Sequence, residues 1–151
     1  MSTAAGILQL YLDEIGEAVM QERFDDYCAR VRLPLNIVTS AANLTIASVE
    51  DLMDGFDDFV AMIHSRGVTS MIRPVMGAAF DGPDRIVGVY ETRLMDGQRM
   101  AMPQFYSKMW IGQFDGVWQA TKIHNTTYDP RWPLMLTRVK PGQRPPKEFQ
   151  T

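Results

Sequence analysis

Hydrophobic residues recur at a helical period in the first part of the chain. Between Ile7 and Val19 the apolar side chains lie three or four positions apart with acidic residues between them, which predicts an amphipathic helix. After Met20 the apolar stripe shifts by about one position, and such a shift favours a kink or two abutting helices. We therefore expect a bent or divided helical segment, which ends before the strand that contains Pro34.

Two short strands and a second helix are predicted next. Residues 33–38 combine a proline with β-branched side chains and are typical of a strand, and residues 43–47 predict another short one. Ser48 precedes Asp51 at the spacing of a capping box, and the apolar positions from Leu52 to Ile63 then mark one helical face. This helix is expected to end at Gly67.

Long runs of β-forming residues replace the helical period after Gly67. Turn sequences at Asp81–Asp84, Met95–Gly97 and Phe114–Gly116 separate these runs, and their Asp-Gly steps favour hairpins. The runs predict four strands in a mostly antiparallel meander, at about 68–80, 85–94, 98–113 and 117–128. Helices followed by a meander indicate an α+β fold.

The composition is that of a globular domain, with 46% hydrophobic and 22% charged residues. We expect residues 1–128 to form a single domain. Residues 129–151 are rich in proline and basic side chains, and they are expected to form a tail that packs in part and is disordered at its end. The chain has a lone cysteine and no apolar run long enough for a membrane helix, which together favour a cytoplasmic protein without a membrane partner.

Charge and motif content exclude several classes of protein. The net charge is −3, and the basic residues of the second half are spaced singly, without the clusters that bind nucleic acid. A glycine-rich phosphate loop, a nucleophile elbow and a paired-cysteine motif are all absent from the sequence. His64 and His124 lack a second histidine or cysteine at a metal-binding spacing. We therefore expect no nucleic-acid partner, no metal site and no cofactor.

The order of these elements resembles that of the nuclear transport factor 2-like (NTF2-like) superfamily, which includes ketosteroid isomerase, scytalone dehydratase and the SnoaL-like polyketide cyclases. The resemblance covers residues 6–128, and its most telling segments are Ile86–Tyr90 and Asp115–Trp118. It implies a curved, mixed but mostly antiparallel sheet that wraps as a cone around the N-terminal helices, with a pocket at the open end. Ketosteroid isomerase-like enzymes have a catalytic aspartate on the early strand pair, but residues 33–47 contain no acidic residue, so that mechanism does not carry over.

The side chains that face such a pocket depend on the register of the hairpins. Two-residue turns at Asp96-Gly97 and Asp115-Gly116 would place Lys108 and Lys122 on opposite faces. Three-residue loops that end in glycine gather Lys108, Lys122, Gln104, His124 and Thr92 on one face and Val87, Val89, Phe105, Met109, Ile111 and Ile123 on the other. We prefer the second register, because it gives one apolar face for the helices to cover.

This register predicts the residues of the site. Its inward face has few polar groups, and Glu91 is the candidate catalytic residue because a carboxylate among apolar walls suits proton transfer near neutral pH. The alternative for Glu91 is an ion pair with Arg93, Arg73 or Arg99. The residues expected to bind a ligand are Ser107, Asn125, Tyr27, Met76, Val89, Met109 and Thr121.

Three classes of function fit these features. The first is a lyase, isomerase or cyclase that acts on a small apolar substrate without a cofactor, the second a binding protein for a small apolar molecule, and the third an interaction domain with a vestigial pocket. Tyr90, Tyr106 and Trp110 are expected together on the outer, mixed face of the sheet. Such an aromatic patch predicts a homodimer formed through the sheet.

Overall fold

The computed structural model describes residues 2–39 and 42–125. The helices are α1 (Ala4–Met20), α2 (Phe24–Cys28) and α3 (Val49–Ser65), and the strands β1 (Val31–Val38) and β2 (Asn43–Ile46) lie between α2 and α3 in the sequence. The remaining strands are β3 (Ser70–Ile72), β4 (Val75–Phe80), β5 (Arg85–Asp96), β6 (Arg99–Met100), β7 (Phe105–Phe114) and β8 (Val117–Asn125). The predicted α+β fold is confirmed.

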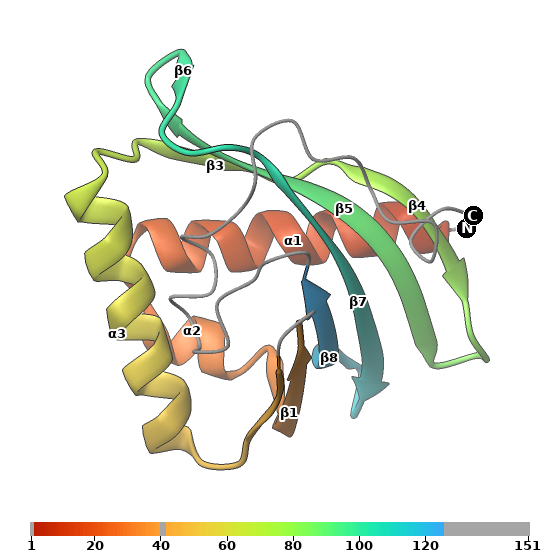
Figure 1. Cartoon of the computed structure of the whole chain (residues 1–151). Coiled ribbons are helices and arrows are strands. Elements are labelled where there is room, and N and C mark those ends of the chain that lie inside the picture. The colour runs from red at the N-terminus through yellow and green to blue at the C-terminus, as the bar shows by residue number, and fades with distance from the viewer. Residues whose placement is uncertain (1, 40–41, 126–151) are drawn as a thin grey trace.

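The strands form one curved sheet in the order β2-β1-β8-β7-β5-β3, and β4 and β6 also pair with β5. β1 and β8 run parallel, while the other pairs are antiparallel. Figure 1 shows β5 and β7 curving around α1, while α3 stands at one end of the sheet and α2 lies between α3 and β1. The mixed, mostly antiparallel sheet therefore wraps around the N-terminal helices, as expected.

Side-chain hydrogen bonds mark where α1 and α3 begin, and a left-handed residue separates α1 from α2. Thr3 caps α1 because its Oγ1 accepts a hydrogen bond from the backbone N–H of Gly6 at 3.0 Å. Ser48 caps α3 in the same way, accepting from the N–H of Asp51 at 3.1 Å. Glu22 has a φ of 58°, and this left-handed residue turns the chain between α1 and α2. The apolar shift after Met20 thus marks two abutting helices.

Two predicted strands are each divided in the structure. The run 68–80 is broken at Arg73 and Pro74, between β3 and β4, because proline has no N–H to donate to a neighbouring strand. Gln9 of α1 fastens this corner: its Nε2 donates to Arg73 O at 2.9 Å, and its Oε1 accepts from Val75 N at 2.9 Å. The run 98–113 is broken similarly between β6 and β7, where Pro103 lies.

The preferred register between β5 and β7 is wrong. Gly97 and Gln98 form a two-residue turn, since Asp96 pairs with Arg99, and further along β5 Tyr90 faces Ser107 and Val89 faces Lys108. Val87 and Val89 therefore share the outer face, which points away from the helices, with Lys108. The predicted inward orientation of these valines does not hold.

The register between β7 and β8 has the expected facing for a different reason. Asp115 and Gly116 have φ values of 51° and 80°, and they form a two-residue turn between the paired Phe114 and Val117. A bulge at Thr121 then adds one residue to β8, because Ile111 pairs with Ala120 while Trp110 pairs with Lys122. The bulge brings Lys122 to the same face as Lys108.

Helix α1 packs closely on β5 at a glycine. A Cβ atom built on Gly88 would lie 2.3 Å from Leu8 Cδ2 and 3.0 Å from the Ala78 Cβ and the Gly77 carbonyl oxygen. Leu8 is fully buried. The sheet and α1 therefore approach each other so closely that a side chain at position 88 would require its neighbours to shift.

Within residues 2–39 and 42–125, no helix is long and apolar enough to cross a membrane. The predicted tail, 129–151, and the last residues of the predicted final strand, 126–128, lie outside the described residues.

Candidate functional site

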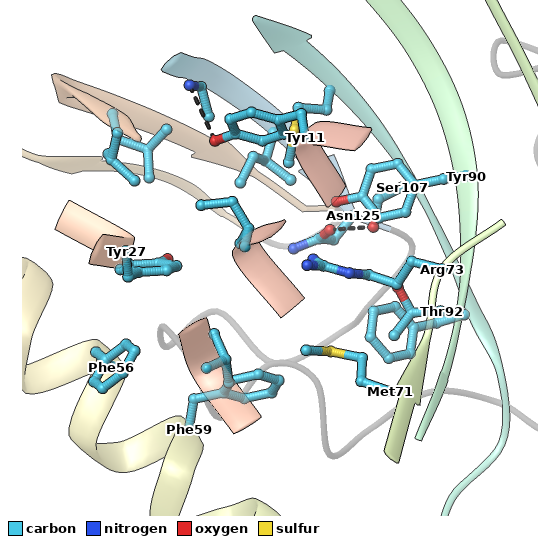
Figure 2. A pocket seen from close by; sticks show the side chains of 18 residues that line it. Tyr11, Tyr27, Phe56, Phe59, Met71, Arg73, Tyr90, Thr92, Ser107 and Asn125 are labelled. Carbon is cyan, nitrogen blue, oxygen red and sulfur yellow. Dashed lines mark hydrogen bonds between the residues drawn. The ribbon is translucent and has the colours of Figure 1, made fainter. Parts of the chain in front are cut away.

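A cavity of about 80 Å³ lies between the helices and the inner face of the sheet. Figure 2 shows its two sides: aromatic side chains from α2 and α3 face polar side chains from the sheet. The helices contribute Tyr11, Ile15, Val19, Tyr27, Phe56 and Phe59, and the sheet contributes Val31, Leu35, Met71, Arg73, Tyr90, Thr92, Phe105, Ser107, Met109, Ala120, Ile123 and Asn125. The volume has room for a few water-sized groups or a small organic molecule.

Three neighbouring strands place a polar cluster in the wall of this cavity. Tyr90 of β5 pairs with Ser107 of β7, which pairs with Asn125 of β8, so their side chains lie side by side on the inner face. The Ser107 hydroxyl donates a hydrogen bond to Asn125 Oδ1 at 2.6 Å. Ser107 is 1% exposed and Asn125 5% exposed. The cluster is thus a buried polar end in a mainly apolar cavity.

Arg73 adds a positive charge beside this cluster. Its side chain extends from the corner between β3 and β4, and its guanidinium group points into the cavity toward Asn125 (Figure 2). One nitrogen, Nη2, donates to the carbonyl oxygen of Leu12 at 2.9 Å. The guanidinium carbon lies 5.9 Å from the centre of the Tyr90 ring. Among the described residues, the ion pairs involve other side chains and none includes Arg73.

The tyrosines of the cavity remain protonated near neutral pH. Burial raises the pKa of Tyr27 to about 12. Burial also raises the pKa of Tyr90, although Arg73 and Ser107 oppose part of this rise. Each phenol is therefore a potential hydrogen-bond donor and not a base. Tyr11 is already engaged, because its hydroxyl donates to Arg30 O at 2.7 Å and accepts from Ala120 N at 3.2 Å.

An aromatic cluster forms the opposite, apolar wall. The Phe56 ring of α3 lies edge-on to Phe24 at 5.3 Å and is tilted against Tyr27 at 5.1 Å, both from α2. These contacts join the short helix α2 to α3 and hold the Tyr27 ring at the cavity. The site therefore consists of an aromatic wall on the helices and a polar wall on the sheet.

Comparisons with known proteins identify the fold. No family model and no curated protein matches the sequence. A solved NTF2-like protein of unknown function from Pseudomonas putida KT2440 has a TM-score of 0.64 at 11% identity, covering 94% of this chain and 96% of that chain. The chain has the NTF2-like fold.

Other solved NTF2-like structures show the same likeness. A protein from Streptomyces avermitilis, provisionally named a dehydratase of the NTF2-like family, has a TM-score of 0.59 at 10% identity, covering 79% of this chain and 91% of that chain. An NTF2-like protein of unknown function from Shewanella oneidensis MR-1 has a TM-score of 0.57 at 12% identity, covering 79% of this chain and 95% of that chain. These TM-scores establish a shared fold. The low sequence identities leave the activity open.

The cavity includes some of the residues predicted to bind a ligand. Ser107, Asn125, Tyr27 and Met109 line it, and their binding role stays a prediction. Met76, Val89 and Thr121 do not line it.

Each of these three residues has another place in the sheet. Met76 is 53% exposed on β4. Val89 packs with Tyr106 on the outer face, and Thr121 Oγ1 donates to Trp110 O at 3.3 Å within the bulge. The one-residue difference in register explains Val89, and the bulge explains Thr121.

The predicted inward orientation of Glu91 is wrong. Glu91 pairs with Tyr106 across the strands and lies on the outer face, one position from the inward Tyr90. Arg93 Nε donates to Glu91 Oε1 at 2.6 Å, and Arg93 Nη2 donates to Oε2 at 3.3 Å. The ion pair with Arg93, which was the alternative role for Glu91, is the one observed.

The cavity also contains residues that the sequence analysis placed elsewhere. The preferred register predicted Tyr90 and Thr92 on the outer face, and Arg73 was considered as a partner for Glu91 alone. Pro74 was a visible signal, because a proline within a β-forming run marks a break or an edge. A residue beside such a break lies outside the regular strands, so the alternation of faces does not fix the direction of its side chain. Arg73 is such a residue.

Proposed function

We propose that this NTF2-like protein binds a small organic molecule with an apolar body, held in the cavity between the helices and the sheet. The observation that supports this function is the buried cluster of Tyr90, Ser107 and Asn125 opposite the Phe56 and Tyr27 rings. A mainly apolar cavity with a few convergent polar groups is the usual form of a small-molecule site. The polar cluster would orient the ligand, and the aromatic wall would bury its apolar part.

Binding is favoured over catalysis by the residues in the cavity wall. The described lining includes no aspartate, glutamate, histidine, lysine or cysteine, and its tyrosines keep their protons near neutral pH. A lyase, isomerase or cyclase commonly needs a group that accepts a proton near the working pH. Such an enzyme is the second candidate, supported by Tyr90 as a neutral donor for a developing oxyanion and by the fold likeness to the provisional dehydratase.

Filling the cavity provides the test of binding. Thermal-shift screening of small organic compounds, followed by calorimetry, is expected to find apolar ligands for the native protein. Met71→Trp places a larger side chain in the cavity wall and should lower the affinity for such ligands by about tenfold or more. Met76→Trp is the matched control, because Met76 lies on β4 away from the cavity, and it should leave affinity unchanged.

Glu91→Gln is a second control for the same ligands. It removes the ion pair with Arg93 on the outer face and should leave affinity unchanged, with a stability loss of less than about 1 kcal/mol. Equal affinity in the native protein and Met71→Trp would contradict the cavity as the binding site. A loss of affinity in Glu91→Gln would restore Glu91 as a functional residue.

We also propose that the chain forms a homodimer through the outer face. Trp110 supports this, because its indole lies on that face with Lys108 Nζ and Lys122 Nζ, which are 5.3 Å and 4.9 Å from the centre of its ring. Tyr90 does not contribute, since it faces the cavity, and Tyr106 is only 8% exposed. The proposed interface is therefore centred on Trp110 and its two lysines.

Sedimentation at micromolar concentration tests the dimer. The native protein is expected at twice the 17.1 kDa chain mass, and Trp110→Glu is expected at the chain mass because it places a carboxylate at the centre of the interface. Met53→Glu, on the exposed side of α3, is the control and should remain dimeric. Native protein at the chain mass alone would rule the dimer out.

A further inference from the structure

We infer that the ligand of this cavity is a monocarboxylate and that Arg73 binds its carboxylate group. This inference rests on the function proposed above and specifies the chemical class of the ligand. It concerns a residue that is part of the cavity wall but has no acidic partner among the described residues.

The first observation is the unbalanced charge of Arg73. A guanidinium group has five N–H donors, and the hydrogen bond from Nη2 to Leu12 O occupies one of them. The side chain is partly buried and faces a largely apolar cavity. Removing a charge from water is unfavourable unless an opposite charge compensates for it. A carboxylate in the cavity would supply that opposite charge.

The second observation is that several elements hold Arg73 in place. Gln9 fixes the backbone on both sides of Pro74, through Arg73 O and Val75 N. On the facing turn of α1, a Cβ built on Gly16 would lie 3.4 Å from Arg73 Nη2, so this glycine leaves room for the guanidinium group against the helix. A cation held in this way is preorganised, and it loses little side-chain entropy when an anion binds.

The third observation is the match between carboxylate geometry and the groups around Arg73. The planar guanidinium group presents paired N–H donors that fit the two oxygens of a carboxylate. Tyr90 lies next to Arg73 and burial raises its pKa, so a protonated phenol is present beside the guanidinium group. The remaining polar groups of the cluster, Ser107 and Asn125, are uncharged.

The charge in the cavity also limits the ligand to a single negative charge. Arg73 provides the one full positive charge among the described lining residues. A phosphate ester would bring a second negative charge that this lining leaves uncompensated, and burying it would be costly. The aromatic wall of Phe56 and Tyr27, opposite Arg73 in Figure 2, favours an apolar group at the other end of the molecule.

The test compares acids with their uncharged analogues. Calorimetry at neutral pH would measure butanoate, pentanoate and hexanoate against the matching primary amides, which have the same chain length and almost the same shape. The native protein is expected to bind the acids about tenfold to a hundredfold more tightly than the amides, the range expected for a charge-assisted hydrogen bond. This ratio is the quantity to compare between variants.

Arg73→Gln should abolish the preference for acids, because glutamine is a polar side chain with hydrogen-bond donors but has no charge. Arg73→Lys keeps the charge without the paired donors, and it should retain a reduced preference. The matched control is Arg93→Gln, which makes the same substitution on the outer face and should preserve the native ratio. The lysine variant keeps the test informative if the glutamine variant does not fold.

The possible outcomes separate this inference from the proposed function. If the native protein binds acids and amides equally, and Met71→Trp binds neither, the cavity binds ligands but the carboxylate inference is wrong. The inference also fails if Arg73→Gln lowers the melting temperature but keeps the acid preference, because Arg73 would then be structural. If no compound of the wider screen binds the native protein, the proposed function fails as well.

Discussion

Gly88→Ala is expected to lower the free energy of unfolding by about 3 kcal/mol, as overpacking does in well-packed cores. The added Cβ would lie 2.3 Å from Leu8 Cδ2, so either the Leu8 side chain or α1 would have to move away from β5. The backbone of β4 also restricts the added methyl group, because the Gly77 carbonyl oxygen would lie only 3.0 Å from the new Cβ atom. Urea denaturation monitored by circular dichroism would measure the loss.

A double-mutant cycle with Leu8→Ala identifies the cause of this loss. Leu8→Ala alone should cost about 2 to 5 kcal/mol, since Leu8 is fully buried. Leu8→Ala also removes the Cδ2 atom that would clash with the added methyl group of Gly88→Ala. The double variant should therefore lose less stability than the sum of the losses in the two single variants. Additive losses would show that the Leu8 contact is not the source of the effect.

Phe56→Ala is expected to cost about 4 kcal/mol, within the range for removal of a buried aromatic side chain. The Phe56 ring is the contact that α3 offers to both Phe24 and Tyr27, so its loss should also loosen α2. The truncation enlarges the cavity on its aromatic side. Apolar ligands too large for the native cavity should therefore raise the melting temperature of the variant more than that of the native protein.

Phe59→Ala is the matched control for this prediction. Phe59 lies one turn further along α3 and also lines the cavity, but it is only partly buried and forms no ring pair within the described part of the chain. Its truncation should cost clearly less than that of Phe56. Equal losses of stability in the two variants would contradict a special role for the aromatic cluster of α2 and α3.

The helices and the fold class were predictable because their signals are local. The apolar period of α1, its interruption after Met20 and the Ser48 cap of α3 are all contained in short stretches of sequence, and the structure has each of them. The strand register was not predictable in the same way. It depends on the number of residues in each turn and on the bulge at Thr121, and a difference of one residue exchanges Tyr90 for Glu91 at the cavity.

The position of Arg73 depends on contacts between distant parts of the chain. Pro74 indicates a break in the strand, but the Arg73 backbone is bound by Gln9 of α1, and its side chain contacts α1 at Leu12 and Gly16. No periodicity or turn motif reports such contacts. For this reason the sequence alone predicted Ser107 and Asn125 in the cavity but did not predict the charged residue beside them.

The bulge at Thr121 makes the composition of the cavity wall depend on the length of β8 as well as on the identity of its residues. If β8 paired with β7 without the bulge, in the register that the two-residue turn starts, Lys122 and His124 would take the inward places of Ile123 and Asn125. An aliphatic and amide wall would become an ammonium and imidazole wall, although no residue had changed identity. The same strand thus encodes two alternative surfaces, and a change of one residue in length between the turn and the bulge is enough to exchange them during evolution.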